Sequence, residues 1–285
     1  MREEVVLATA CGDATAGGGE QQQVDASRVR EFLAWDSKDP SFASWVSRTY
    51  RYFYVGLGKT ASTRVKLSLH LLEGHRVLER PFPWLHARAT PGESFVPTLG
   101  DLPVQDALGV LTSPDWFRFC FVRNPYDRLF AAYKAFIMRD ASPPSPFYRR
   151  IAEEIRTRQR YGERGRCRDA IVCFRDFVQY VQETLPERQD YHWCQMTWGL
   201  RPDLVRYDVV GHFESFAEDF GRVLRRLGVD EEVIPHLLEP ENEGPIEKLP
   251  LAAVYDWDLA EQVYEMYRDD FSTYGYEKHS WLGDR

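Results

Sequence analysis

The sequence predicts an α/β fold in which a parallel sheet is flanked by helices. Two short apolar runs, residues 51–57 and 116–122, have the β-branched and aromatic composition typical of buried strands. Each run is followed by a stretch with apolar residues at helical spacing, and this alternation is characteristic of parallel sheets. Residues 207–214 and 216–228 repeat the pattern as a third strand and a following helix.

The remaining elements follow from the same hydrophobic patterns. Helices are predicted at residues 28–37, 61–74, 124–139, 174–183, 216–228 and 259–271. Gly74 suits the end of the second of these helices, and Pro125 suits the first turn of the third. Residues 75–104 are rich in proline and glycine, which predicts a long irregular loop, and loops of this length are more often functional than filler.

The composition of the 285 residues is globular, and the chain is long enough to bury a substantial core. Residues 1–27 include the low-complexity stretch ATAGGGEQQQ and are expected to be a loose tail, whereas residues 28–285 are expected to form a single domain. The N-terminal run VVLATA is too short for a signal peptide or a membrane span, and no later run reaches spanning length. We therefore expect a cytoplasmic or otherwise soluble protein.

The formal net charge of −8 gives no reason to expect nucleic acid as a partner, so any anion must be held by a local basic cluster. The cysteines are irregularly spaced and include no CxxC pair, and no Asp/Glu/His cluster has ligand spacing, so no metal is expected. We expect reduced thiols at Cys11, Cys120, Cys167, Cys173 and Cys194. The alternative is a disulfide within the region of the last three.

Residues 149–168 carry eight arginines interspersed with glutamates. Charge runs of this kind are usually exposed, and we expect a solvated, disordered loop. The alternative is a surface that holds an anionic acceptor, such as a glycan that contains uronic acid.

The first predicted strand leads into GLGKTAST, residues 56–63. A glycine-rich turn between a strand and a helix N-terminus places backbone N–H groups around an anion, as in a P-loop. The ATP-binding pattern G-x-x-x-x-G-K-[ST] would need a glycine at position 53, which is Phe53 here. The loop is therefore P-loop-like without being an ATP loop, and an ordinary turn with a surface lysine is the alternative.

The second predicted strand ends at Val122 and directly presents Arg123. Ligands of α/β folds bind at the carboxyl ends of the strands, and the planar guanidinium of an arginine suits a phosphate. Arg128 follows further along the predicted helix; it could join the same site or pair with Asp127 or another carboxylate.

Together these segments resemble the sulfotransferases that use 3′-phosphoadenosine 5′-phosphosulfate (PAPS), particularly the Golgi carbohydrate sulfotransferases of the chondroitin and dermatan 4-O type. KTAST at 59–63 matches the 5′-phosphosulfate loop of that family, and FVRNPYDRLFAAYK at 121–134 matches its 3′-phosphate segment without a gap. Further similar segments follow in the same order, so the resemblance covers roughly residues 50–276.

The resemblance implies a sulfotransferase fold and transfer of a sulfuryl group from PAPS to a hydroxyl of a sugar, a glycolipid or a small metabolite. The other product is adenosine 3′,5′-bisphosphate, and no metal is required. Lys59 is expected to stabilise the leaving oxygen and Arg123 to hold the 3′-phosphate. The residues expected to bind the donor are Gly58, Lys59, Thr60, Ala61, Ser62, Thr63, Arg123 and Arg128. The serine of the family's 3′-phosphate segment is Ala131 here, so one hydrogen bond must be lost or compensated.

The acceptor hydroxyl needs a general base. His86 is the preferred candidate, because relatives also carry a histidine ahead of the second strand. His192 is a second candidate; together with Trp193 it is more readily interpreted as orienting or binding the acceptor. Glu214, at the end of the third strand, is a third candidate and is also expected among the residues that bind the acceptor. Its alternative is a buried carboxylate that braces the phosphate loop or caps the next helix.

Two other functions stay open from the sequence. A nucleotide-dependent kinase of related fold would need an intact phosphate loop and a magnesium-holding carboxylate, and Phe53 counts against it. A non-catalytic nucleotide- or sugar-binding protein on the same fold is conceivable because of Ala131.

Overall fold

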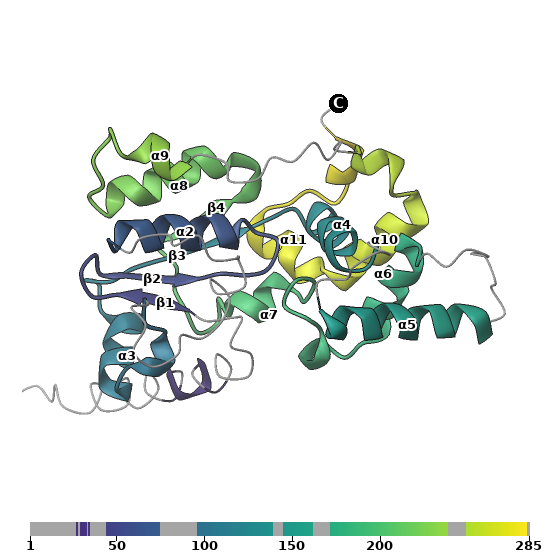
Figure 1. Ribbon diagram of the computed structural model, residues 1–285, viewed down its shortest axis with the longest axis horizontal. Helices are drawn as coiled ribbons and strands as arrows, with labels where there is room; N and C mark the ends of the chain where they lie inside the picture. Colours follow the sequence, from purple (N-terminus) through teal and green to yellow (C-terminus); the bar gives the residue numbers. More distant parts are fainter. Residues whose placement is uncertain are drawn as a thin grey trace, which may run out of the picture.

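The computed structural model describes residues 27, 29–32, 34, 44–74, 96–138, 145–161, 172–238 and 249–283, without the side chains of 159–161. This part of the chain forms a four-stranded sheet with helices on both faces and a helical lobe beside it (Figure 1). Residues 1–26 of the predicted tail lie outside the described residues, and Ser27 is helical. The described positions between 27 and 34 are helical, in agreement with the first predicted helix.

The sheet has the order β1-β2-β3-β4. Its strands are β1 (Trp45–Ser47), β2 (Tyr52–Val55), β3 (Phe117–Val122) and β4 (Val209–His212). β2, β3 and β4 are parallel, with Tyr54 opposite Phe119 and Phe119 opposite Val209. The prediction of a parallel sheet is confirmed for these three strands, whereas the antiparallel edge strand β1 was not predicted.

Side chains of the strands alternate between two cores. On one face, Phe53 and Val55 of β2 pack with the residues of α3. On the other face, Tyr52 and Tyr54 pack with α2, α8 and α9. These helices are α2 (Ser62–Leu72), α3 (Val104–Thr112), α8 (Phe216–Arg226) and α9 (Ile234–Leu238), and Figure 1 shows them on either side of the sheet. Strands buried on both faces explain why the sequence shows continuous apolar runs instead of alternation.

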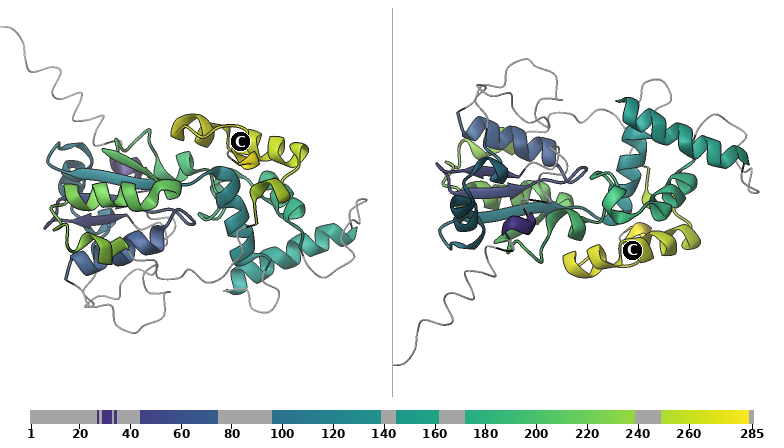
Figure 2. Two further views of the ribbon diagram at one scale, coloured as in Figure 1. Left: turned by 90° about the horizontal axis from the view of Figure 1, so that it is seen from above. Right: turned by 90° about the horizontal axis from the view of Figure 1, so that it is seen from below.

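The helical lobe has its own core of buried aromatic and aliphatic side chains. It is built from α4 (Pro125–Phe136), α5 (Pro146–Tyr161), α6 (Phe174–Glu183), α10 (Trp257–Met266) and α11 (Arg268–Tyr274). The short helix α7 (Met196–Leu200) lies between this lobe and the sheet (Figures 1 and 2). Because α4 begins directly after β3, one helix connects the carboxyl edge of the sheet to the lobe.

The expectation of a disordered loop at 149–168 is wrong for its first part. Residues 146–161 form α5, and Tyr148, Ile151, Ala152 and Ile155 bury one face of this helix at helical spacing. On the solvent side Arg158 pairs with Glu154 and Glu183. The arginines after residue 161 that belong to this block lie outside the described residues.

Two other boundaries differ from the prediction. The helix predicted at 259–271 is divided in two at Tyr267, and its first part begins earlier, at Trp257, where the carboxylate of Asp256 caps the helix. The end of the predicted 75–104 loop holds a 3₁₀ turn at Leu99–Asp101 and the first residue of α3. The rest of that loop, 75–95, lies outside the described residues.

The cysteines that the structure describes are not bridged. Cys120 and Cys194 are buried free thiols, and the Cys173 thiol donates to Asp176 at 2.6 Å. In the same described ranges, no helix is long and apolar enough to cross a membrane, and no three metal-ligating side chains come together.

Candidate functional site

The predicted site residues meet at the carboxyl edge of the parallel strands. β2 leads into the loop 56–61, β3 ends one residue before Arg123, and β4 ends two residues before Glu214. The Nη1 of Arg123 donates to the Lys59 carbonyl at 3.1 Å, and the Asn124 amide donates to Glu214 Oε1 at 2.7 Å. The structure therefore joins three segments that are far apart in sequence.

The loop after β2 has an unusual backbone. Lys59 and Ala61 adopt φ angles of 67° and 65°, in the left-handed region that non-glycine residues rarely occupy. Such conformations cost of order 1–3 kcal/mol each and cluster at ligand-binding sites. Ala61 is the N-cap residue of α2 and makes no side-chain capping bond. The amides at a helix N-terminus form a site suited to an anion.

Thr60 and Ser62 are buried within the loop. The Thr60 hydroxyl is buried and donates to the Leu57 carbonyl at 3.0 Å, so it closes the loop from within. Ser62 is also buried, whereas Lys59, Ala61 and Thr63 are partly exposed. Any contact of Thr60 with the donor would therefore come from its backbone.

Lys59 lies above an aromatic ring of the neighbouring helix. Its Nζ is 4.6 Å from the ring centroid of Phe136, at the end of α4. A cation over the face of an aromatic ring is stabilised electrostatically, so the ammonium has a defined place beside the loop.

Arg123 is held on three sides. Its Nε and Nη2 donate to Asp127 Oδ2 at 2.9 and 2.8 Å, and the guanidinium lies 3.9 Å from the Phe213 ring centroid. The pairing with Asp127 that the sequence suggested for Arg128 is thus made by Arg123. With 13% of its side chain exposed, Arg123 keeps a face toward solvent at the strand ends.

Arg128 lies beneath the loop, and this corrects the expectation that its guanidinium faces the donor. The residue is 2% exposed, and its donors contact three carbonyls. Nε donates to Gly58 at 3.0 Å, Nη1 to Cys194 at 2.5 Å and Nη2 to Tyr191 at 2.7 Å. Arg128 supports the loop by joining it to the segment 191–194.

His192 belongs to that segment and packs against the loop. Its Nδ1 lies 2.6 Å from Asp190 Oδ1, and its ring contacts Gly58. Burial lowers the pKa of His192; the Asp190 carboxylate opposes this shift, and Lys59 and Arg128 reinforce it. The imidazole is therefore neutral near pH 7. His86, the preferred general base, lies outside the described residues.

Trp193 and Glu214 are not placed as acceptor-binding residues. Trp193 is 1% exposed and packs against Phe177 in the lobe core, so its ring does not face a ligand. Glu214 is exposed, and its second oxygen accepts from the Tyr276 hydroxyl at 3.0 Å. By holding the Asn124 amide, Glu214 braces the start of α4, whereas the alternative from the sequence was a buried carboxylate bracing the phosphate loop or capping the next helix.

Asp190 and Tyr148 are site residues that the sequence did not single out. Both contact Nδ1 of His192, Tyr148 through its hydroxyl at 3.0 Å. The only local signal was an aspartate two residues before the histidine, a spacing at which Asp190 also accepts the His192 amide. Tyr148 comes from α5, which had been expected to be a loop.

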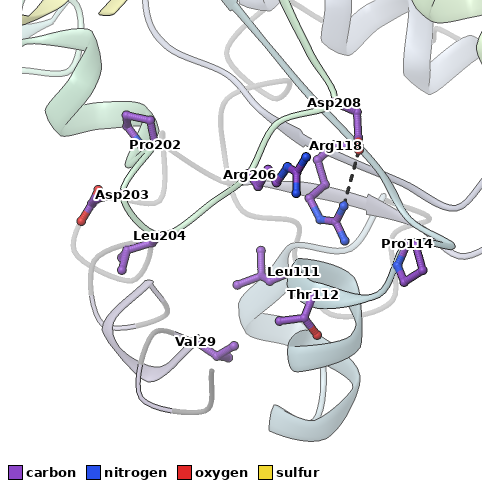
Figure 3. A pocket seen from close by; sticks show the side chains of 10 residues that line it. All are labelled: Val29, Leu111, Thr112, Pro114, Arg118, Pro202, Asp203, Leu204, Arg206 and Asp208. Atoms are coloured by element: carbon purple, nitrogen blue, oxygen red, sulfur yellow. Dashed lines mark hydrogen bonds and ion pairs between the residues drawn. The ribbon is translucent and has the colours of Figure 1, made fainter. Parts of the chain in front are cut away.

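A cavity of about 580 Å³ lies at the opposite, amino-terminal edge of the sheet (Figure 3). Its buried arginine, Arg118, donates to the carbonyls of Val110, Ser113 and Trp116 and pairs with Asp208 at 3.4 Å. These contacts brace the first residues of β3, and the cavity shares no lining residue with the loop at the other edge.

Comparison with known proteins gives the family. A model of the sulfotransferase family matches residues 43–277. Carbohydrate sulfotransferase 14 of Danio rerio is 27% identical over 62% of this chain, which is 48% of that protein. Carbohydrate sulfotransferase 10 of Xenopus laevis and of Homo sapiens are 26% and 25% identical, over 84% of this chain and 68% of each relative.

A crystal structure of a sulfotransferase from Alicyclobacillus acidocaldarius is 15% identical and covers 80% of this chain and 88% of that chain at a TM-score of 0.31. This score is too low to carry an argument about the fold, which rests on the strand order and register described above. The family match covers most of the chain, including the loop and the start of α4. The chain belongs to the sulfotransferase family.

Proposed function

We propose that this protein transfers a sulfuryl group from PAPS to a hydroxyl group of a carbohydrate. The observation that carries the proposal is the hydrogen bond from Arg123 Nη1 to the Lys59 carbonyl, 3.1 Å long. It joins the loop expected to hold the phosphosulfate to the segment expected to hold the 3′-phosphate. A donor with anionic groups at both ends fits two neighbouring cationic segments, whereas ATP lacks the 3′-phosphate.

The described residues fit such a donor. The N-terminus of α2 and the Lys59 ammonium would hold the 5′-phosphosulfate, and Arg123 would hold the 3′-phosphate. Asp127 fixes the guanidinium plane of Arg123 through two hydrogen bonds. Arg128 and Glu214 brace the backbone of the two segments from outside the ligand's path.

PAPS supplies the sulfuryl group: the acceptor oxygen bonds to sulfur while the bond from sulfur to the bridging oxygen breaks. Negative charge then develops on the bridging oxygen, and an ammonium held in place by the protein stabilises that charge without reorganisation. Lys59 is the residue we assign to this role. The proton of the acceptor hydroxyl passes to a base, for which His86 stays the prediction.

The acceptor is proposed from the relatives, whose names describe them as carbohydrate sulfotransferases. We propose a sugar hydroxyl, on a saccharide, a glycolipid or a small glycoside, and assign its selection to segments 75–104 and 139–170. A cytoplasmic or otherwise soluble location is likewise a proposal from the sequence.

Isothermal titration calorimetry with adenosine 3′,5′-bisphosphate and with ATP tests the donor. We expect the bisphosphate to bind more tightly than ATP, and Arg123→Ala to weaken bisphosphate binding about 10- to 100-fold, because a charge-assisted contact is worth about 1.5–3 kcal/mol. Arg158→Ala is the control, since this arginine lies on α5, pairs with Glu154 and Glu183 and lies over the Tyr180 ring. Absence of bisphosphate binding, or equal binding by Arg123→Ala, would show the donor assignment to be wrong.

Transfer of labelled sulfate from PAPS to a panel of saccharides tests catalysis. Lys59→Ala should lower turnover about 100-fold or more, because removal of one preorganised group that stabilises a developing anion typically has an effect of this size. Lys134→Ala is the matched control, because its Nζ lies 4.7 Å from the Phe130 ring centroid, in the same kind of contact. Binding without transfer would favour the non-catalytic alternative, and consumption of ATP would favour the kinase.

A further inference from the structure

Gly58 is a glycine because of its neighbour. An ideal Cβ at this position would lie 2.3 Å from Cδ2 and 2.8 Å from Cγ of His192, closer than any side chain can approach. The φ angle of Gly58 is not among the positive ones, so its backbone does not require glycine. The requirement comes from His192, whose imidazole ring makes the two shortest contacts and whose Cα would lie 2.9 Å from the added Cβ.

The ring of His192 is fixed by two partners on its far side. Nδ1 is 2.6 Å from Asp190 Oδ1 and 3.0 Å from the Tyr148 hydroxyl, which also donates to Asp190 Oδ2 at 3.3 Å. Asp190 and His192 have side-chain exposures of 8% and 11%. A carboxylate at this distance takes the Nδ1 proton as a hydrogen bond and so fixes both the tautomer and the orientation of the imidazole.

Contacts continue from His192 to the Lys59 ammonium. The Phe136 ring lies 4.2 Å from the imidazole and 4.4 Å from the Tyr148 ring, measured between centroids. Lys59 Nζ lies over the same Phe136 ring. Asp190 and Tyr148 thus fix the imidazole of His192. The imidazole in turn contacts the loop backbone at Gly58 and the ring of Phe136, over which the Lys59 ammonium lies.

We propose that His192 is a positioning residue that sets the Gly58–Lys59 backbone and thereby the Lys59 ammonium for the donor, and that it neither accepts the acceptor's proton nor binds the acceptor. This inference rests on the proposed donor site. Within the described part of the chain, the titratable and charged groups facing the imidazole are Asp190, Tyr148, Tyr191, Lys59 and Arg128. Burial lowers the pKa of His192, which favours the neutral form of the ring.

A double-mutant cycle tests the contact. Gly58→Ala and His192→Ala should each lower kcat about 10- to 100-fold, because misplacing a catalytic group by about 1 Å costs that much. The losses should be less than additive in the double variant, because removal of the ring relieves the contacts at 2.3 and 2.8 Å, while the contact with the Cα of residue 192 at 2.9 Å remains. Additive losses, or wild-type turnover in either single variant, would overturn the proposal.

Hydrogen exchange of the loop amides without ligand gives a second readout. We expect faster exchange at residues 57–63 in both single variants. The control is Gly211→Ala, whose Cβ would lie 2.4 Å from Phe121 inside the sheet: it should lower stability and leave kcat of the folded fraction unchanged. Hydrogen exchange is measured without PAPS, so it tests the contact between His192 and the loop independently of donor binding. Failure of the wild type to bind the bisphosphate would overturn the proposed function, whereas unchanged exchange in the variants would overturn the role of His192.

The pH profile separates positioning from proton transfer. If His192 is a positioning residue, His192→Ala lowers kcat/KM by the same factor at every pH, and the acidic limb of the profile remains. His192→Phe retains a ring beside Gly58 and should recover part of the lost activity. Disappearance of the acidic limb, with rescue by added imidazoles that increases with their basicity, would show that His192 accepts the proton and would overturn the proposal.

Discussion

The guanidinium of Arg128 donates from Nε to the Gly58 carbonyl at 3.0 Å, from a position inside the protein where only 2% of the residue is exposed. Its two other nitrogens reach the carbonyls of Tyr191 and Cys194. A single side chain of α4 thus joins the loop after β2 to the segment that carries His192. The loop owes its shape to tertiary contacts, since its own backbone contains two left-handed non-glycine residues.

Arg128→Met should therefore destabilise the protein by about 3–5 kcal/mol, because buried carbonyls that lose their donors cost about 1–3 kcal/mol each. Urea denaturation measures the change. Arg158→Met is the matched control: this side chain is 48% exposed in its ion pairs, and its loss should cost about 1 kcal/mol or less. Equal destabilisation by the two variants would contradict the supporting role of Arg128.

Ala131→Ser should restore the hydrogen bond that the family's serine provides. Ala131 is partly exposed on α4, two turns after Arg123, so a hydroxyl fits there without overpacking. Affinity for adenosine 3′,5′-bisphosphate should rise about 10-fold, with no gain for ATP, as measured by calorimetry. Ala135→Ser, one turn further and also partly exposed, should leave both affinities unchanged. A fall in bisphosphate affinity with Ala131→Ser would mean that another group already occupies this place.

Glu214→Gln should weaken the start of α4 without removing the catalytic base. The carboxylate accepts from the Asn124 amide and the Tyr276 hydroxyl, and a neutral amide makes weaker versions of such bonds. We expect a loss of about 1 kcal/mol in stability and weaker bisphosphate binding, with the acidic limb of the pH–rate profile retained. Loss of that limb would instead identify Glu214 as the proton acceptor.

Asp270 gives a pH-dependent contribution to stability. Burial raises its pKa from 3.8 to about 6, although it accepts hydrogen bonds from the amides of Met196 and Thr197. Between pH 3.8 and about 6 the folded state binds more protons than the unfolded state. The contribution of Asp270 to the free energy of unfolding therefore falls as pH rises through this window.

Comparison with Asp270→Asn isolates that contribution. The difference in free energy of unfolding between wild type and variant should shift by up to about 3 kcal/mol between pH 4 and 7, in the direction that disfavours the wild type at higher pH. Urea titrations at several pH values measure it. A difference that does not change with pH would show that the Asp270 pKa is not raised.

The parallel strands could be predicted because each is apolar on both faces. Phe119 and Phe121 point to one core and Cys120 and Val122 to the other, so the run carries a strong signal of its own. The edge strand at Trp45–Ser47 has no such signal, because its three residues depend on pairing with β2. α5 was mistaken for a loop because its many charged residues masked a four-residue apolar face.

The positions of candidate site residues could be predicted where a local sequence pattern, such as a strand followed by a cationic residue, indicates them. Arg123 directly follows β3 and Lys59 lies in the short loop after β2, and the carboxyl edge of a parallel sheet brings such residues together. The placement of Arg128, Trp193 and His192 depends on which side of the loop each side chain lies, and only tertiary packing decides that. An arginine one helical turn beyond a binding residue can as well point into the protein as toward a ligand.

The contacts of Gly58 have a consequence for chimeras between members of this family. Its carbonyl is held by Arg128 and its Cα faces His192, so the eight residues of GLGKTAST do not form a portable motif. Exchange of this segment alone between two relatives would place a foreign loop on a fixed support. Loop, α4 and the 190–194 segment must be exchanged as a set, and natural substitutions in one of them should be accompanied by changes in the other two.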